Sequence, residues 1–398
     1  MDALINKFRR LIASNATTFK RSLSYKINWE ARGICIEGAR GTGKSTMMLQ
    51  YIKANLPLDR TLYASLDDLY FRQNGLVEVA EKFYEQGGRH LFLDEVHKYE
   101  DWQTAVKNTY DFLPELKLVV SGSSILALQQ SRSDLSRRLL RYHLPELSFR
   151  EYLSLKHRAE FPEYTLEDIL VNHSEIAGEI HKILPSPLKS LNEYFNYGAY
   201  PFFIEGEGDY FMRISQLINV IIDYDLPEAK AIEVSTLAKL KKLLYIISTS
   251  VPFKPNITKL AEQVDTSRTR LLEMLHVLEQ AKLINNLRSS AHGISLMNKP
   301  EKIFLHNTSL IAALAEGRPD TGNVRETFFL SQVENSGAVV TYPKDGDFMV
   351  NGKYLFEVGG KNKSNEQIRG YENAFVVADD LEYGWGNKIP LWLFGFLY

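Results

Sequence analysis

Nine consecutive residues have the types and the spacing of a phosphate-binding loop. The stretch 38–46 reads GARGTGKST and fits the pattern G-x-x-x-x-G-K-[ST]. Its glycines allow the backbone to curl so that the N–H groups surround phosphates, and a following helix adds the positive end of its dipole. Lys44 would then reach the β- and γ-phosphates of ATP, and the Ser45 hydroxyl would bind Mg²⁺. A glycine-rich turn that only joins a strand to a helix is the structural alternative.

All members of this loop are candidate cofactor-binding residues. They are Gly38, Ala39, Arg40, Gly41, Thr42, Gly43, Lys44, Ser45 and Thr46.

An acidic pair follows further along the chain. Residues 90–95 read HLFLDE, an apolar run that ends in two carboxylates. Open α/β sheets bind their ligands at the carboxyl edge, where such a run delivers its last side chains. Asp94 is therefore the candidate Mg²⁺ ligand, and Glu95 is the candidate catalytic residue that polarises an attacking water. Either acid alone could be an ordinary carboxylate at the end of a strand.

A parallel sheet is needed to bring these residues together. Within the first 150 residues, short apolar runs alternate with segments of helical length. This alternation predicts a mostly parallel sheet covered on both faces, an α/β layer domain. The runs lie at 33–37, 61–66, 90–93, 117–120 and 139–144.

The composition is that of a folded protein with more than one domain. At roughly 100–200 residues per domain, 398 residues predict two to four folding units. A hydrophobic content of 44% and a charged content of 24% exclude disordered and collagenous chains. The net charge of -2 by itself predicts no attraction to nucleic acid or to an anionic membrane.

Several features favour a cytoplasmic protein without a membrane segment. The single cysteine, Cys35, cannot form an internal disulfide, and the sequence shows no zinc-ligand spacing. The first residues lack the apolar stretch of a secretory signal. The longest apolar run, IPLWLFGFLY at 389–398, is about half as long as a membrane-spanning helix, so we expect a buried strand there.

The charge of the chain varies strongly along its length. Residues 151–235 carry 15 acidic and 6 basic residues and have long amphipathic stretches, which predict a helical connector or lid. Residues 236–315 carry 11 basic and 5 acidic residues, and residues 316–398 mix strand-like runs with turns. With 1–150 as the first domain, this gives four predicted segments.

At this point the chain resembles a known family, the AAA-type ATPases of bacteria and archaea with a C-terminal restriction-endonuclease-like domain. The resemblance is carried by the phosphate loop, LFLDEVHKYEDW at 91–102, the strand ending in SGSS at 121–124, LSFREYL at 147–153 and YGAYPFF at 197–203. It implies an α/β multidomain fold: a P-loop sheet, a helical connector, a winged helix-turn-helix and a small α+β nuclease-like domain.

The resemblance also implies roles near the phosphates. Ser123, with Ser121 as the other candidate, would be a nucleotide-sensing residue and joins the candidate cofactor-binding set. Arg138 stands where the family has the arginine of a Gly-Arg pair and is a candidate catalytic residue. This chain has Arg137 in place of the glycine, and a solvated surface role is the alternative for either arginine.

Two short helices joined by a tight turn are predicted in the basic segment. Residues 256–285 carry apolar side chains at helical spacing on both sides of a turn at 265–267, which is typical of a helix-turn-helix. Two strand-like runs, 283–287 and 302–305, would form a wing, with the loop 288–300 between them. A DNA-binding version would direct the start of its second helix into the major groove of double-stranded DNA. The candidate contact residues are Ser267, Arg268, Thr269 and Arg270. A module that binds protein instead of DNA is the alternative.

The C-terminal segment carries acids that match a nuclease pattern. Restriction-like folds hold a divalent metal with an Asp and a Glu, and a Lys two positions after the Glu stabilises phosphoryl charge. Asp347 and Glu357, in a predicted strand–turn–strand hairpin, and Glu326 on the preceding helix are the candidate acids. The expected Lys position holds glycine, and Lys361 follows two residues late. This displacement favours loss of nuclease activity and use of the fold for docking a protein partner.

The sequence therefore predicts an ATP-binding and ATP-hydrolysing AAA-type protein whose nucleotide state controls the winged helix and the C-terminal domain. ATP and Mg²⁺ are the expected cofactors, and a homo-oligomer is possible because a neighbouring subunit can supply an arginine. One alternative is a regulatory scaffold that turns ATP over slowly. The other is an ATP-regulated, metal-dependent nuclease.

Overall fold

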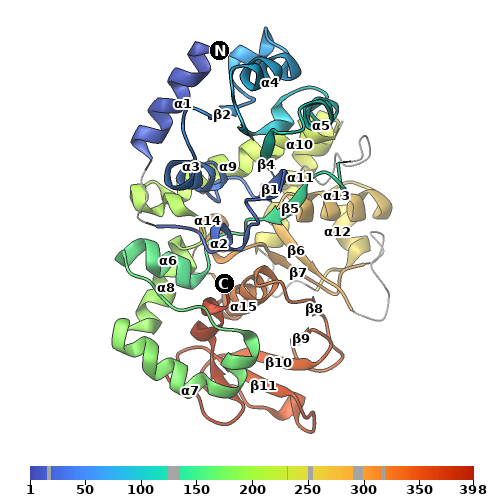
Figure 1. Cartoon of the computed structure of the whole chain (residues 1–398). Coiled ribbons are helices and arrows are strands. Elements are labelled where there is room, and N and C mark those ends of the chain that lie inside the picture. Colours follow the sequence, from blue (N-terminus) through green and yellow to red (C-terminus); the bar gives the residue numbers. More distant parts are fainter. Residues whose placement is uncertain are drawn as a thin grey trace. The chain divides into compact units, whose positions relative to one another are not determined.

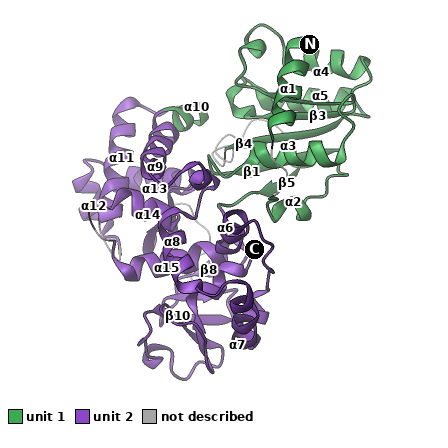
Figure 2. Ribbon diagram, turned by 90° about the vertical axis from the view of Figure 1, so that its left-hand side faces the viewer, with its two compact units in different colours: residues 1–146, 224–231 green, residues 147–223, 232–398 purple. Residues whose placement is uncertain are grey.

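The chain divides into two compact units (Figure 2). The computed structural model describes residues 1–15, 19–123, 135–230, 232–249, 254–289, 299–315, 317 and 319–398. The first unit consists of Met1–Glu146 and Tyr224–Ala231, and the second of Leu147–Asp223 and Ile232–Tyr398. A short piece from the middle of the chain thus belongs to the N-terminal unit. The finer division into four segments stays a prediction.

A parallel sheet of five strands forms the centre of the first unit (Figure 1). Its order is β2-β3-β4-β1-β5, and every neighbouring pair is parallel. The strands are β1 (Gly33–Gly38), β2 (Thr61–Ser65), β3 (His90–Asp94), β4 (Lys117–Ser123) and β5 (Leu140–His143). The predicted α/β layer domain with a P-loop type of sheet is confirmed. Strands β1 to β4 are almost wholly buried, as expected for a parallel sheet covered by helices.

Helices cover this sheet and share one hydrophobic core with it. Helix α1 packs on β2 and α3, while α4 packs on α5. The helices are α1 (Asp2–Ser14), α2 (Leu23–Lys26), α3 (Lys44–Asn55), α4 (Leu76–Glu85), α5 (Trp102–Phe112) and α10 (Leu226–Ala229). Two 3₁₀ turns, η1 (Leu69–Arg72) and η2 (Val96–Lys98), follow β2 and β3.

The second unit begins with helices, as the amphipathic pattern after residue 150 predicts. They are α6 (Phe149–His157), α7 (Leu166–Ile183), α8 (Pro187–Tyr197) and α9 (Tyr210–Val220), followed by the π-helical turn η5 (Ile221–Asp225). Helix α11 (Val234–Thr249) comes next.

The basic segment contains two helices and a hairpin in the places where the sequence predicts them. Helix α12 (Ile257–Gln263) and helix α13 (Arg268–Gln280) are joined by a turn in which Asp265 has a φ of 53°. Strands β6 (Ile284–Leu287) and β7 (Lys302–Leu305) pair antiparallel. Residues 290–298, most of the predicted wing loop, lie outside the described residues.

The C-terminal part is a mixed sheet with two helices before it. Helices α14 (Thr308–Leu314) and α15 (Thr321–Asn335) precede five strands in the order β12-β11-β10-β9-β8. The strands are β8 (Val340–Thr341), β9 (Phe348–Val350), β10 (Tyr354–Gly359), β11 (Ala374–Ala378) and β12 (Lys388–Pro390). Pairs β8–β9 and β9–β10 are antiparallel, whereas β10–β11 and β11–β12 are parallel.

The expectation of a strand at the C-terminal apolar run is wrong. Strand β12 ends at Pro390, and a buried 3₁₀ helix, Leu391–Phe396, follows it. Its aromatic side chains pack on α6, α7 and α15, so this run is buried against helices and does not extend the sheet. Within the described residues, no helix has the length and apolar character needed to cross a membrane.

Candidate functional site

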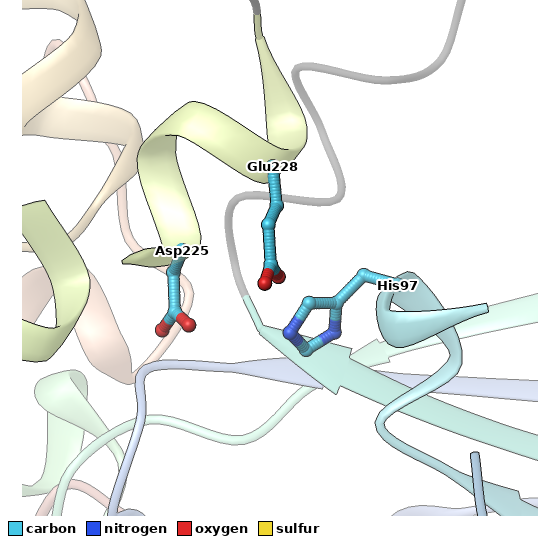
Figure 3. Close-up of side chains that lie close together, drawn as sticks. All are labelled: His97, Asp225 and Glu228. Carbon is cyan, nitrogen blue, oxygen red and sulfur yellow. The ribbon is translucent and has the colours of Figure 1, made fainter. Parts of the chain in front are cut away.

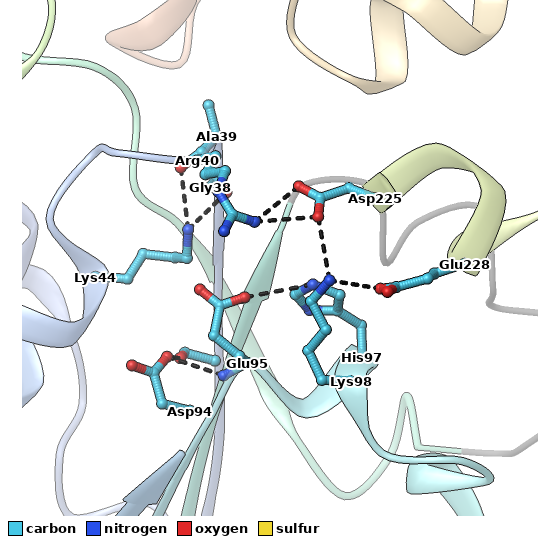
Figure 4. A network of polar contacts seen from close by, with 11 residues as sticks. Gly38, Ala39, Arg40, Lys44, Asp94, Glu95, His97, Lys98, Asp225 and Glu228 are labelled. Carbon is cyan, nitrogen blue, oxygen red and sulfur yellow. Dashed lines mark hydrogen bonds and ion pairs between the residues drawn. The ribbon is translucent and has the colours of Figure 1, made fainter. Parts of the chain in front are cut away.

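The glycine-rich loop lies where the sequence predicts it, between β1 and α3 (Figure 4). Gly41 and Gly43 have φ values of 81° and 94°, a region that other residues adopt only with strain. A Cβ at Gly38 would lie 2.4 Å from the carbonyl oxygen of Leu144, which follows β5. The loop therefore needs glycine at 41 and 43 for backbone conformation and at 38 for close packing.

Lys44 is buried within this loop. Its Nζ donates to the carbonyl oxygens of Gly38 and Ala39, both at 3.0 Å. Burial lowers the pKa of the Lys44 ammonium, while the nearby carboxylates of Glu95 and Asp94 act in the opposite direction. A buried ammonium of this kind is well placed to accept a phosphate as its counter-ion.

Asp94 ends β3 and is held by three donors. Its carboxylate accepts hydrogen bonds from the Tyr63 hydroxyl at 2.5 Å, from the Ser121 hydroxyl, and from the backbone N–H of Glu95 at 3.0 Å. Tyr63 also shares a side-chain hydrogen bond with Ser45, so it links the two candidate Mg²⁺ ligands. Sequence reasoning missed Tyr63, because the pairing of β2 with β3 becomes visible only once the strand order is known.

Glu95 stands in a strained and electrostatically unusual position. Its φ of 51° is left-handed, which costs a non-glycine residue about 1–3 kcal/mol. Burial raises the pKa of its carboxyl group; Lys44 opposes this effect and Asp94 adds to it. Oε2 of Glu95 lies 3.3 Å from Nε2 of His97, a residue that sequence reasoning did not single out.

A second set of charges surrounds Asp225, which comes from the segment Tyr224–Ala231 (Figure 4). Both Asp225 oxygens accept from the guanidinium of Arg40, at 3.0 and 3.1 Å. Nζ of Lys98 lies 3.3 Å from Asp225 and 2.6 Å from Glu228. The phosphate loop is thus tied to a segment about 185 residues away in sequence, and no local pattern signals this contact.

His97, Asp225 and Glu228 also have the donor types of a metal site (Figure 3). One donor atom from each lies within 4.8 Å of the others. The ammonium of Lys98, however, already bridges the two carboxylates. Burial, with the charge of Lys98 as a further cause, lowers the pKa of His97 to about 4, so the imidazole is neutral at pH 7. Ion pairing accounts for this cluster.

The structure separates the two remaining nucleotide-site candidates. Ser123 is buried at the end of β4 and pairs in register with Gly38, next to the phosphate loop. Arg138 lies at the end of the sheet where the parallel strands begin, opposite the phosphate loop. A Cβ added at Gly33, the first residue of β1, would lie 2.3 Å from the Arg138 carbonyl oxygen. Its guanidinium forms two hydrogen bonds of 2.8 Å with Asp111.

Arg138 therefore lies away from the phosphate loop of its own chain, and its candidate catalytic role stays a prediction. Strand β1 has six residues between that end of the sheet and the loop, a span of about 16 Å at 3.3 Å per residue.

The three C-terminal acids come together in the second unit around two lysines. Lys302 on β7 forms an ion pair with Glu326 on α15, and its Nζ lies 3.9 Å from Asp347. Lys363 binds Oε1 of Glu357 at 2.5 Å. Burial raises the pKa of both Glu326 and Glu357, while their lysine partners counteract it. Among the described residues, Oε2 of Glu357 is buried without a hydrogen-bond partner.

The lysine at this cluster is Lys363 and not the predicted Lys361. After β10 the chain turns back, with the N–H of Lys363 bonded to the carbonyl of Gly360. The Lys363 side chain then passes over Gly359, where an added Cβ would lie 2.7 Å from its Cδ. Lys361 is exposed. The glycine that replaces the expected lysine therefore makes room for a lysine from four residues further on.

The four candidate DNA-contact residues lie in the first turn of α13. Ser267 is its N-cap and accepts from the backbone N–H of Arg270 at 3.3 Å. Ser267, Arg268, Thr269 and Arg270 are all exposed. Their contact with DNA stays a prediction.

Comparison with known proteins gives matches to two families along the chain. The family model described as an AAA domain matches residues 30–153, which contain the sheet, the phosphate loop and the acidic pair. A model described as a domain of unknown function (DUF8612) matches residues 188–321.

One curated relative and several solved structures are similar to the chain. The uncharacterized protein MJ1637 of Methanocaldococcus jannaschii is 28% identical over 92% of this chain and 84% of its own length. A structure titled for katanin self-assembly is 13% identical over 53% of this chain and 84% of its own, with a TM-score of 0.28. The S. cerevisiae Hsp104–ADP complex is 17% identical over 69% of this chain and 37% of its own, with a TM-score of 0.27. With scores this low, the fold assignment rests on the sheet topology and the family match.

Proposed function

Since residues 30–153 form an AAA-type domain, we propose that the protein binds ATP with Mg²⁺ and hydrolyses it. The observation that carries this proposal is the meeting of Lys44, Asp94 and Glu95 at the carboxyl edge of one parallel sheet. Both carboxylates favour the charged form of Lys44, although the chain between Lys44 and Asp94 contains most of helix α3, strand β2, helix α4 and most of strand β3.

The oxygen donors at this edge suit Mg²⁺. The ion prefers carboxylate and hydroxyl oxygens and keeps several waters, and Ser45 and Asp94 would hold it through such ligands. When bound, Mg²⁺ neutralises charge on the β- and γ-phosphates. Lys44 would exchange its two carbonyl partners for phosphate oxygens. Glu95 would orient a water and accept its proton.

Steady-state phosphate release tests this assignment. Lys44→Ala should lose ATP binding, because it removes the phosphate counter-ion. Glu95→Gln should retain ATP binding but lower turnover by roughly 10²–10⁴-fold, the usual contribution of a general base. Glu100→Gln, at an exposed acid in the same loop region, is the matched control. Turnover that neither Lys44→Ala nor Glu95→Gln changes would refute the site.

ATP binding and phosphate release, measured together, distinguish an active ATPase from a regulatory scaffold. A protein that binds ATP tightly yet releases phosphate too slowly to measure would be the regulatory scaffold. The engagement of Arg40 by Asp225 favours this reading, because it withholds a phosphate-loop cation from the nucleotide.

A second candidate function, metal-dependent cleavage of nucleic acid, is favoured by the position of Lys363. A lysine does reach Glu357, so the displaced lysine no longer argues against activity. Asp347 and the unpartnered Oε2 of Glu357 would hold a divalent metal, and Lys363 would stabilise phosphoryl charge. The exposed turn Ser267–Arg270 in the same unit would provide phosphate contacts to DNA.

A cleavage assay with Mg²⁺ or Mn²⁺ on double-stranded DNA tests this second function. Asp347→Ala and Lys363→Ala should both abolish cleavage, whereas Lys361→Ala, at an exposed lysine, should not. Cleavage that persists in Asp347→Ala would come from a contaminant. No cleavage by the wild type would leave the acids a role in docking a protein partner.

A further inference from the structure

The segment 224–231 stands out because the chain enters and leaves it from the other unit. Residues up to Asp223 and from Ile232 belong to the second unit, whereas the segment itself belongs to the first. Two acids only two residues apart make this division clear. Asp223 pairs with Lys241 of the second unit at 2.6 Å, and Asp225 pairs with Arg40 of the first.

Asp225 is the anchor of this segment. Its side chain is fully buried, and its oxygens are bonded to Arg40 and Lys98. A buried carboxylate is stable only while cations satisfy it, since its removal from water costs several kcal/mol. Glu228, which is 44% exposed, adds a second bond to Lys98. The hold on the segment thus depends on two cations, and one of them lies in the phosphate loop.

If the loop binds ATP, Arg40 has two anions within reach, the carboxylate of Asp225 and the nucleotide phosphate. It is the third residue of the loop, and its charge influences the ionisation of both Lys44 and Glu95. A guanidinium binds phosphate oxygens through the same fork of donors that it presents to a carboxylate. A γ-phosphate carries more charge than Asp225, and one guanidinium cannot satisfy both fully.

We propose that nucleotide phosphate and Asp225 compete for Arg40, so that ATP binding loosens the segment 224–231 and reports nucleotide state along the chain to the second unit. This inference rests on the proposed function, because it requires nucleotide in the phosphate loop. Asp225 is then a positioning residue: it sets where Arg40 points and lowers the affinity for ATP. The change in ATP affinity depends on the fraction of molecules in which Arg40 is not bonded to Asp225 and can bind phosphate.

Hydrogen exchange of the full-length protein and titration with a fluorescent ATP analogue test the competition together. In the wild type, the non-hydrolysable analogue AMP-PNP with Mg²⁺ should speed exchange in peptides covering 221–230. Asp225→Asn should show fast exchange without nucleotide and should bind the analogue at least about threefold more tightly. Asp223→Asn, whose acid pairs in the second unit, should behave like the wild type in both measurements.

A milder variant covers the case in which Asp225→Asn fails to fold. Glu228→Gln keeps Asp225 and removes the negative charge that pairs with Lys98, so it should speed exchange of the segment and raise nucleotide affinity by less than Asp225→Asn does. Analogue that binds without altering exchange of the segment would overturn this inference and leave the ATPase proposal intact. Exchange in Glu228→Gln identical to the wild type would likewise contradict the anchoring role. Failure of the wild type to bind nucleotide would overturn both proposals.

Discussion

At the residue scale, Glu95 has the most unusual backbone and electrostatics of the candidate nucleotide site. Its backbone is left-handed, its carboxyl group is mostly buried, and its pKa is raised by that burial. A raised pKa brings a general base closer to the working pH, where it accepts a proton more readily. The same feature destabilises the folded protein at neutral pH, because the buried group is then ionised.

Glu95→Gln is therefore expected to raise the free energy of unfolding at pH 7 to 8. A group whose folded pKa lies above its unfolded pKa adds stability at low pH, and this contribution is lost as the pH rises through the folded pKa. Glutamine stays neutral, so the difference between variant and wild type should be small near pH 4 and grow toward neutrality. Urea unfolding across this range measures it, and a difference that shrinks with rising pH would contradict the raised pKa.

At the scale of elements, turns and caps decide which side chains reach a site. The sharp turn after β10 allows Lys363 to form an ion pair with Glu357. The pairing of β2 with β3 allows the Tyr63 hydroxyl to donate a hydrogen bond to Asp94. Helix α6, the first element of the second unit, begins with a capping box in which Ser148 and Glu151 bond each other's backbone N–H groups. The Ser148 hydroxyl also donates to the carbonyl of Tyr398 at 2.6 Å, so one side chain fixes both the start of α6 and the C-terminus.

Ser148→Ala should lower the free energy of unfolding by about 1–2 kcal/mol, the usual value of an N-cap plus a buried hydrogen bond. Ser154→Ala within the same helix is the control, since alanine is a better helix former than serine and should cost little. Chemical denaturation monitored by circular dichroism gives both values. Equal losses for the two variants would show that the cap contributes nothing specific.

At the scale of the whole molecule, the division into two units separates the nucleotide site from the acidic cluster. The phosphate loop, Asp94, Glu95 and Asp225 all belong to the first unit, whereas Glu326, Asp347 and Glu357 belong to the second. Multidomain chains commonly unfold in more than one step, and a ligand stabilises the domain that binds it.

Calorimetry should accordingly show two transitions, of which ATP analogue with Mg²⁺ raises only one. At about 100 times the dissociation constant, the stabilisation should reach about 2.7 kcal/mol. Lys44→Ala should lose this shift and keep both transitions. A single transition that the analogue raises as a whole would mean that the units unfold as one.

The sequence by itself determined the features that depend on neighbouring residues. The phosphate loop, the acidic pair after β3 and the five strands of the first unit follow from consecutive residue types and from apolar periodicity. For the same reason the hairpin and helix that carry Asp347, Glu357 and Glu326 were predictable.

Only the tertiary structure decided which distant residues meet. Arg138 pairs with Asp111 at the end of the sheet where the strands begin, away from the phosphate loop. Lys363, and not Lys361, forms an ion pair with Glu357, and Asp225 forms one with Arg40. Such contacts depend on strand order, on the path of a turn and on where a chain crosses between units. Local spacing carries none of this information, because the free energy of a long-range ion pair is set by burial and by partners far away in sequence.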